Sequence, residues 1–356
     1  MTVAGVWTLG YGASNTSADA KPGSPAAIDE TAVVDAVRAS QRMGPKLLVP
    51  PPTDKLGLDI AIEDRDGKSM RALHEALLRA EAGEGQARLV FYGASHVASD
   101  LFTGYIRREL QRRYGDAGHG FVVPVHPWRT YRHKDINIES DGKRWTTHRI
   151  RVGDREVEKV GLAGVAMESK AINSFGAVST TEDNEFGRAA DTFELYYMKQ
   201  PRGGDLDVLI DGRQARRLST RAQKPATAYA TFRVPDTGHR FEVRTLSRRP
   251  VRLFGVAVER DVPGVIVDTL GINGSRARYQ LLWDEDIYKE HLQRRNPDLV
   301  VLAYGTNESG DESPLEDYER DLRAVVERMR DTVPNASCLL IGPSDRPAQV
   351  EERVFE

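Results

Sequence analysis

The sequence predicts an α/β fold, a parallel sheet between helical layers, interrupted by an inserted all-β module. An apolar run at 87–92 leads into a glycine-opened turn and a helical pattern at 99–114. Strand, tight turn and helix follow one another in this way in open α/β sheets. Apolar runs return at 264–268 and 299–304, a composition typical of strands buried in a parallel sheet. Residues 145–260 lie between the helical pattern at 99–114 and these later runs. They alternate polar and apolar residues over short segments, which indicates antiparallel strands.

We therefore expect four segments along the chain. Residues 1–53, rich in small residues and proline, are expected to be a leader and linker that is largely disordered. Residues 54–144 would form the first part of the α/β domain, 145–260 a β-sandwich or jelly roll, and 261–356 the second part. The leader lacks the basic start and long apolar stretch of a signal peptide, and the sequence leaves export open.

Composition limits the classes of function. Fifty basic against 53 acidic residues give a net charge of −3 without a basic stripe along the chain, which argues against a nucleic-acid binder. The single cysteine, Cys338, allows no internal disulfide. The sequence has no apolar stretch long enough to span a membrane. It also has no Cys/His cluster at metal-ligand spacing and no phosphate-binding glycine loop, so we infer no metal and no cofactor.

Ser95 is the candidate nucleophile. A serine attacks a carbonyl only when a base takes its proton and hydrogen-bond donors stabilise the oxyanion that forms. Ser95 lies in a turn opened by Gly93, between a buried strand and a helix, so its own backbone N–H could be one donor. A glycine and a serine after a strand also fit a plain helix-capping serine, and this motif alone does not separate the two.

Two further loops favour the catalytic interpretation. The loop at 271–275 contains Gly274 and follows the second apolar strand of the α/β pattern. The loop at 305–308 contains Asn307, whose amide can donate to an oxyanion, and follows the third. Each loop alone could be a turn that merely needs a positive φ. Because all three follow predicted parallel strands, we expect them at one edge of the sheet.

These motifs together resemble the SGNH/GDSL hydrolases. The run 93–96 (Gly-Ala-Ser-His) with Asp100 resembles the first sequence block of that superfamily. Gly274 matches the glycine of its second block and Asn307 the asparagine of its third. With a β module between the first and second blocks, the layout is similar to peptidoglycan O-acetylesterases and related carbohydrate esterases.

The resemblance implies a three-layer, flavodoxin-like SGNH sheet and a serine esterase. Ser95 would attack an ester carbonyl, and the backbone N–H groups of Ser95 and Gly274 with the Asn307 side chain would hold the oxyanion. Three neighbouring side chains are further candidates for substrate binding: His96, Asp100 and Glu308.

The sequence departs from the family pattern at two places. Ala94 replaces the usual aspartate of the first block. The family's C-terminal Asp-x-x-His, which supplies the general base, is absent, because no histidine follows His291. We therefore expect a C-terminally truncated sheet without its last strand. The one Asp-x-x-His present, at 116–119, precedes the other blocks and fits a turn after a helix better than a base.

The leading hypothesis is an esterase that removes O-acyl groups, and O-acetyl groups in particular, from a carbohydrate through an acyl-enzyme on Ser95. Without the Asp/His base, this chain is expected to be weak or inactive. One alternative is a catalytically dead carbohydrate-binding protein, and another is an O-acetyltransferase that uses the same serine. The expected partner is an acylated carbohydrate such as peptidoglycan, and the resemblance implies an extracytoplasmic (periplasmic or cell-envelope) location.

Overall fold

The structure is a computed structural model that describes residues 62–64, 66–311, 314–343, 349–351 and 354–355. The expected leader at 1–53 lies outside these residues. Asp64–Glu356 form one unit of the chain. No helix in the described part of the chain is long and apolar enough to cross a membrane.

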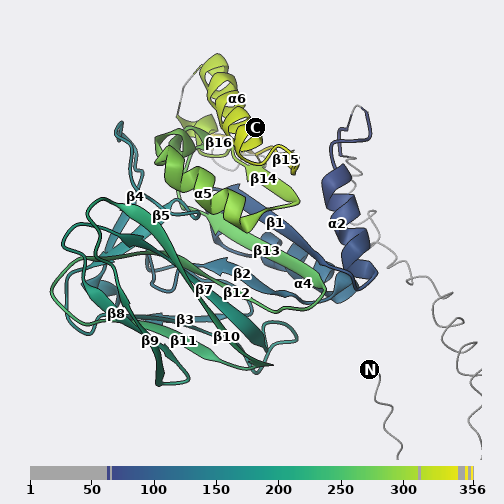
Figure 1. Cartoon of the computed structure of the whole chain (residues 1–356). Helices are drawn as coiled ribbons and strands as arrows, with labels where there is room; N and C mark the ends of the chain where they lie inside the picture. Colours follow the sequence, from purple (N-terminus) through teal and green to yellow (C-terminus); the bar gives the residue numbers. More distant parts are fainter. Residues whose placement is uncertain (1–61, 65, 312–313, 344–348, 352–353, 356) are drawn as a thin grey trace, which may run out of the picture. The chain divides into compact units, whose positions relative to one another are not determined.

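Four parallel strands form the sheet of the α/β domain, in the order β13-β1-β14-β15 (Figure 1). Their bounds are β1 (Gln86–Gly93), β13 (Gly264–Gly271), β14 (Leu299–Ala303) and β15 (Ser337–Ile341). The first strand in the chain therefore lies inside the sheet, with the second on one side and the third on the other. Open α/β sheets bind ligands where the strand order reverses in this way, at the carboxyl ends of the strands.

Helical layers cover both faces of this sheet, as the burial of consecutive residues in β1 requires. Leu89 and Phe91 belong to a core shared with α2 (Arg71–Glu81) and α4 (Phe102–Tyr114). Val90 and Tyr92 point to the other face, into the core that includes residues of α5 (Glu285–Arg295) and α6 (Leu315–Thr332). The predicted three-layer α/β fold is confirmed.

Two antiparallel sheets make up the inserted β module (Figure 1). The aromatic rings of Phe193 and Phe241, one from each sheet, stack with centroids 5.2 Å apart, so the two sheets face one another across a shared core. One sheet has the order β10-β7-β12-β5-β4, with β2 also paired to β12, and its strands are β2 (Gly118–Val122), β4 (Thr146–Arg149), β5 (Val165–Ser169), β7 (Ala190–Lys199), β10 (Ala226–Thr237) and β12 (Val251–Glu259). The other has the order β3-β6-β11-β8-β9, with strands β3 (Asn137–Ser140), β6 (Phe175–Ser179), β8 (Asp205–Ile210), β9 (Arg213–Ser219) and β11 (Arg240–Thr245).

The antiparallel sheets begin earlier in the chain than the sequence suggested. β2 pairs with β12 and β3 pairs with β6, although both strands precede residue 145. The expected boundary between 144 and 145 therefore does not separate the two kinds of sheet. Short strands such as β3 show their partners only in the folded chain, because antiparallel pairing joins segments far apart in sequence.

Candidate active site

Strand register brings the three predicted loops to one edge of the parallel sheet. Gly93 at the end of β1 lies beside Gly271 of β13 and Ala303 of β14. The Gly93 carbonyl accepts a hydrogen bond of 3.0 Å from the N–H of Ile272, which joins the first loop to the second. The chain segments that carry Ser95, Gly274 and Asn307 thus leave the sheet side by side.

Two glycines explain how closely the turn of the candidate nucleophile approaches the sheet. A Cβ on Gly93 would lie 2.7 Å from the carbonyl oxygen of Ala303, and a Cβ on Gly271 would clash with the backbone of Ala98. Because Gly93 and Gly271 have no Cβ, α3 (Ser95–Ala98) can lie directly against the ends of the strands. Ser95 is the exposed first residue of α3, so its backbone N–H has no acceptor within the helix.

The second and third loops are held together by Asn307. Its Nδ2 donates to the carbonyl oxygen of Ser275 at 2.8 Å, directly after Gly274. An amide nitrogen carries two hydrogens, so the second remains available to an oxyanion. Gly274 is exposed with a φ of +75°, and its carbonyl accepts a hydrogen bond of 2.6 Å from Arg276. Arg276 therefore fixes the peptide that follows Gly274, whereas the peptide that carries the Gly274 N–H is contacted at the Asn273 carbonyl by Arg149.

Glu308 holds the loops in place and also lines a cavity beside Gly305, so its contact with substrate stays a prediction. One carboxylate oxygen accepts from the backbone N–H of Ala277 at 2.7 Å, and the other accepts from Gly305 at 3.1 Å. Both oxygens are thus engaged by the second and third loops. The sequence could not show this, because the Ala277 donor lies 31 residues away.

Asp100 is also a positioning residue, which corrects the expectation that it binds substrate. It is completely buried, with an ion pair of 2.7 Å to Arg107 and hydrogen bonds from Thr103, Thr269 and the backbone of Lys134. Burial opposes the charged carboxylate, but Arg107 and the other donors outweigh it, and the pKa of Asp100 lies below its ordinary value. This side chain cannot face a substrate.

His96 follows Ser95 and is exposed. Within the described residues, neither His96 nor any other histidine is hydrogen-bonded to the Ser95 hydroxyl. His119, from the early Asp-x-x-His, is buried, and its Nε2 lies 3.2 Å from Nδ1 of His133. The motif is a turn between α4 and β2, in which Asp116 accepts from the N–H of Gly118 at 2.9 Å.

The β module contributes two residues to this edge that the sequence did not reveal. Thr130 accepts a hydrogen bond of 3.4 Å from the Asn273 side chain, and the Arg149 guanidinium lies 3.4 Å from the Asn273 carbonyl oxygen. Arg149 also lies over the ring of Trp128, 5.5 Å from its centroid. No sequence signal links these residues to a loop more than 120 residues later. Among the described residues, no group of His, Cys, Asp and Glu could hold a metal ion.

Comparisons with known proteins show which family model and which folds this chain resembles. The model of the GDSL-like Lipase/Acylhydrolase family matches residues 233–354, which include Gly274 and Asn307. A peptidoglycan O-acetylesterase structure is similar at 21% identity with a TM-score of 0.58, over 76% of this chain and 70% of that one. A family two carbohydrate esterase from Cellvibrio japonicus aligns at 16% identity with a TM-score of 0.21, over 55% of this chain and 78% of that one. The carbohydrate-binding module CBM36 in complex with calcium and xylotriose aligns at 11% identity with a TM-score of 0.23, over 35% of this chain and 94% of that one. The curated proteins contain no match to this chain.

The parallel sheet, the three loops at its carboxyl edge and the family match confirm the resemblance to the SGNH/GDSL hydrolases. Residues 233–354 match the GDSL-like Lipase/Acylhydrolase family model, and the chain shares its fold with the peptidoglycan O-acetylesterase.

Proposed function

We propose that this chain removes O-acyl groups, and O-acetyl groups in particular, from a carbohydrate through an acyl-enzyme on Ser95. The observation that carries the proposal is the register of Gly93, Gly271 and Ala303, which places the loops of Ser95, Gly274 and Asn307 at one edge. Ser95 Oγ attacks the acyl carbon and passes its proton to solvent water, since no described histidine is hydrogen-bonded to it. The sugar oxygen then leaves with a proton, and water releases the acyl group as an acid.

The oxyanion of the tetrahedral intermediate would be stabilised by three N–H donors. These are the backbone N–H of Ser95, the backbone N–H of Gly274 and the free hydrogen on Asn307 Nδ2. The donors are held in advance by Ile272, Ser275 and Arg149, so they need little rearrangement when charge develops. Such preorganised donors contribute about 3 to 4 kcal/mol each in serine hydrolases.

The general base is the weak point of the site. No histidine follows His291 in the printed sequence, and none in the described part hydrogen-bonds to Ser95. A hydrolase of this kind without its base keeps only the contribution of the oxyanion hole and of substrate binding, about 10³- to 10⁴-fold over water. We accordingly expect slow turnover from this chain.

Two observations support a carbohydrate substrate. The α/β fold is shared with a peptidoglycan O-acetylesterase, and the β module sends Thr130 and Arg149 to the second loop. Acylated peptidoglycan or another cell-surface polysaccharide is the proposed substrate, and the proposed location is extracytoplasmic.

The test compares Asn307→Ala with the unchanged chain on an aryl acetate and on an acetylated polysaccharide. We expect kcat/KM to fall by about 10²- to 10³-fold, because one oxyanion donor is lost. Asn335→Ala, at an exposed asparagine before β15, is the matched control and should leave the rate unchanged. Mass spectrometry of the quenched reaction should find the acetyl group on Ser95. Equal rates for Asn307→Ala and the unchanged chain, or an acetyl group elsewhere, would refute the proposal.

The second candidate is a carbohydrate-binding protein without catalysis. It is favoured by one observation, the lack of a hydrogen bond from any described histidine to Ser95. It predicts that an acetylated polysaccharide binds equally to the unchanged chain and to Ser95→Ala. It also predicts that neither form releases acetate faster than buffer.

A further inference from the structure

One end of the β module gathers basic turns from five separate parts of the chain. The turns are 142–144, 170–173, 200–204, 220–224 and 246–250, named here the basic end. Hydrogen bonds place them side by side: Arg144 to the Ile172 carbonyl (3.0 Å), Asn173 N to Thr245 O (2.8 Å), Leu246 N to Asp205 O (3.0 Å), Gly204 N to Pro250 O (2.9 Å) and Ala222 N to Gln200 O (3.1 Å). The charges of these turns therefore share one surface.

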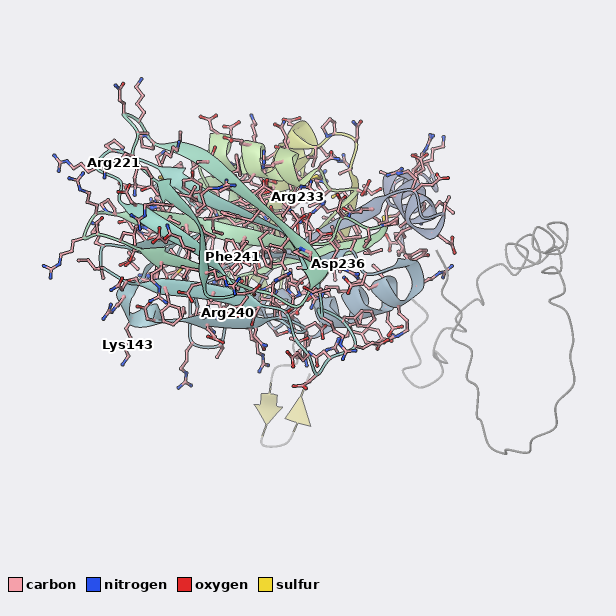
Figure 2. The ribbon with its side chains drawn as sticks, turned by 60° about the horizontal axis from the view of Figure 1, so that its bottom comes forward. Lys143, Arg221, Arg233, Asp236, Arg240 and Phe241 are labelled. Atoms are coloured by element: carbon pink, nitrogen blue, oxygen red, sulfur yellow. The ribbon has the colours of Figure 1, made fainter. Side chains whose placement is uncertain are left out.

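None of the five turns contains an acidic residue. Their exposed cations are Lys143, Arg144, Lys170, Arg202, Arg221, Lys224, Arg248 and Arg249. The flanking carboxylates Asp141, Glu168 and Asp205 pair with Arg144, Lys170 and Arg221. Figure 2 shows Lys143 and Arg221 projecting outward at this end, away from Arg233 and Asp236.

Five of these cations have no carboxylate partner. Lys143, Arg202, Lys224, Arg248 and Arg249 form no ion pair with any described residue. Clustered like charges repel one another and raise the local potential, which attracts a polyanion and accelerates its encounter. This concentration of charge contrasts with the chain as a whole, whose net charge is −3.

A groove leads from the basic end toward the candidate active site. It is lined by Arg144, Thr146, His148, Glu168, Lys170 and Ala171 and follows β4, an edge strand that pairs only with β5. β4 ends at Arg149, which contacts Asn273 beside Gly274. A strand of this length spans about 13 Å, so an extended polymer of a few sugar units could reach from one end to the other.

We propose that the basic end binds an anionic polysaccharide and directs it along β4 to Ser95. The inference rests on the proposed function for the position of the reacting sugar, but not for the binding itself. Carboxylate or phosphate groups of the polymer would pair with Arg202, Lys224, Arg248 and Arg249. In the groove, the hydroxyl of Thr146 and the imidazole of His148 can form hydrogen bonds with sugar hydroxyls.

A glycan fits this surface better than a nucleic acid. Proteins that hold single strands without sequence preference stack the bases on exposed aromatic rings. The five turns contain no aromatic residue, and the exposed large apolar side chain among them is Ile172. The surface therefore offers charge without a platform for bases.

The test measures binding of the full chain to fluorescent polygalacturonate and to a poly(glycerol phosphate) by anisotropy, at several salt concentrations. The variant replaces four of the five unpaired cations by glutamine: Arg202→Gln, Lys224→Gln, Arg248→Gln and Arg249→Gln. The control has the same change of net charge at exposed positions of the α/β domain: Lys68→Gln, Arg113→Gln, Arg323→Gln and Arg330→Gln. We expect the variant to bind at least about tenfold more weakly and with a flatter salt dependence, and the control to stay within about twofold. Tighter binding of polygalacturonate would identify carboxylate as the preferred anion, and tighter binding of poly(glycerol phosphate) would identify phosphate.

Three results would overturn this inference. Equal weakening in variant and control would assign the binding to net charge rather than to the basic end. Tighter binding of single-stranded DNA than of both glycans would assign the surface to nucleic acid. Lack of binding to either glycan by the unchanged chain would leave the surface without this role. Ser95→Ala separates the two proposals, because it should abolish acyl transfer while leaving both dissociation constants unchanged.

Discussion

At the scale of single residues, the candidate site depends on two glycines that have no side chain. Gly93 and Gly271 have no Cβ, and this permits the backbone of α3 to lie against the ends of β1 and β13. Ser95 consequently projects from the edge of the sheet and not from a longer loop. Asn307 completes the arrangement, since its amide ties the third loop to the second.

The substitution Gly271→Ala tests this close approach. The added methyl group would clash with the backbone of Ala98, so α3 must move or the strand must shift. We expect a loss of about 1 to 3 kcal/mol in the free energy of unfolding, measured with urea, together with loss of acyl transfer. Gly342→Ala is the control, because its methyl group would meet open space without a positive φ, and it should change neither.

At the scale of elements, a buried ion pair fixes the junction between α3 and α4. Asp100 has a φ of +50°, which breaks the helix that the sequence predicted to run continuously from residue 99. Its carboxylate ties Arg107 of α4 to Thr269 of β13 and to the backbone of Lys134. The turn that carries Ser95 is thus anchored to the helix behind it, the neighbouring strand and the start of the β module.

The substitution Asp100→Asn removes the charge of this junction and keeps its shape, since asparagine tolerates a positive φ. It leaves the buried Arg107 with the Asp135 carboxylate, 3.9 Å away, as its remaining counter-charge, so the free energy of unfolding should fall by up to about 3 to 5 kcal/mol. Asp317→Asn breaks an exposed pair with Arg320 and should cost less than about 1 kcal/mol. Urea titrations of both variants provide the comparison, and equal losses would contradict the assigned role of Asp100.

At the scale of the whole described unit, buried charges and buried neutral histidines join the β module to the α/β domain. Arg295 of α5 pairs with Asp268 of β13 at 2.7 Å and with Glu259 of β12 at 2.6 Å. The β2 strand lies next to this pair, because the N–H of Phe121 donates to Asp268. His291 of α5 is buried and accepts a hydrogen bond from the N–H of Leu162 in the module.

Two histidines, His133 and His291, predict that the free energy of unfolding falls as the solution becomes acidic. Burial lowers the pKa of His133 to about 4 and that of His291 to about 3. In the unfolded chain a histidine has a pKa of about 6.5. Between these values the unfolded state takes up protons that the folded state refuses, so each histidine lowers the free energy of unfolding by about 1.4 kcal/mol per pH unit of acidification.

Urea unfolding at about pH 7 and at about pH 5 measures this dependence, and His291→Gln should reduce its slope because one titrating group is removed. His74→Gln, at an exposed position of α2, is the control and should leave the slope unchanged. A slope that does not respond to His291→Gln would show that His291 does not take part in this linkage.

The sequence by itself determined the local parts of the fold and the site. Apolar runs and glycine turns predicted β1, β13 and β14, and parallel pairing required that the loops of Ser95, Gly274 and Asn307 meet at one edge. These predictions succeed because strand formation and tight turns depend on residues close together in the chain.

Only the tertiary structure decided the roles that depend on distant partners. Asp100 looked like a substrate contact, but it is buried and Thr269 engages its carboxylate from far along the chain. The bond from the Ala277 N–H to Glu308 likewise joins segments that are distant in sequence. The basic end was invisible for the same reason, since its five turns are far apart in the sequence and meet only through antiparallel pairing. The chemistry of a side chain is fixed by its residue type, whereas what that side chain contacts is fixed by the fold.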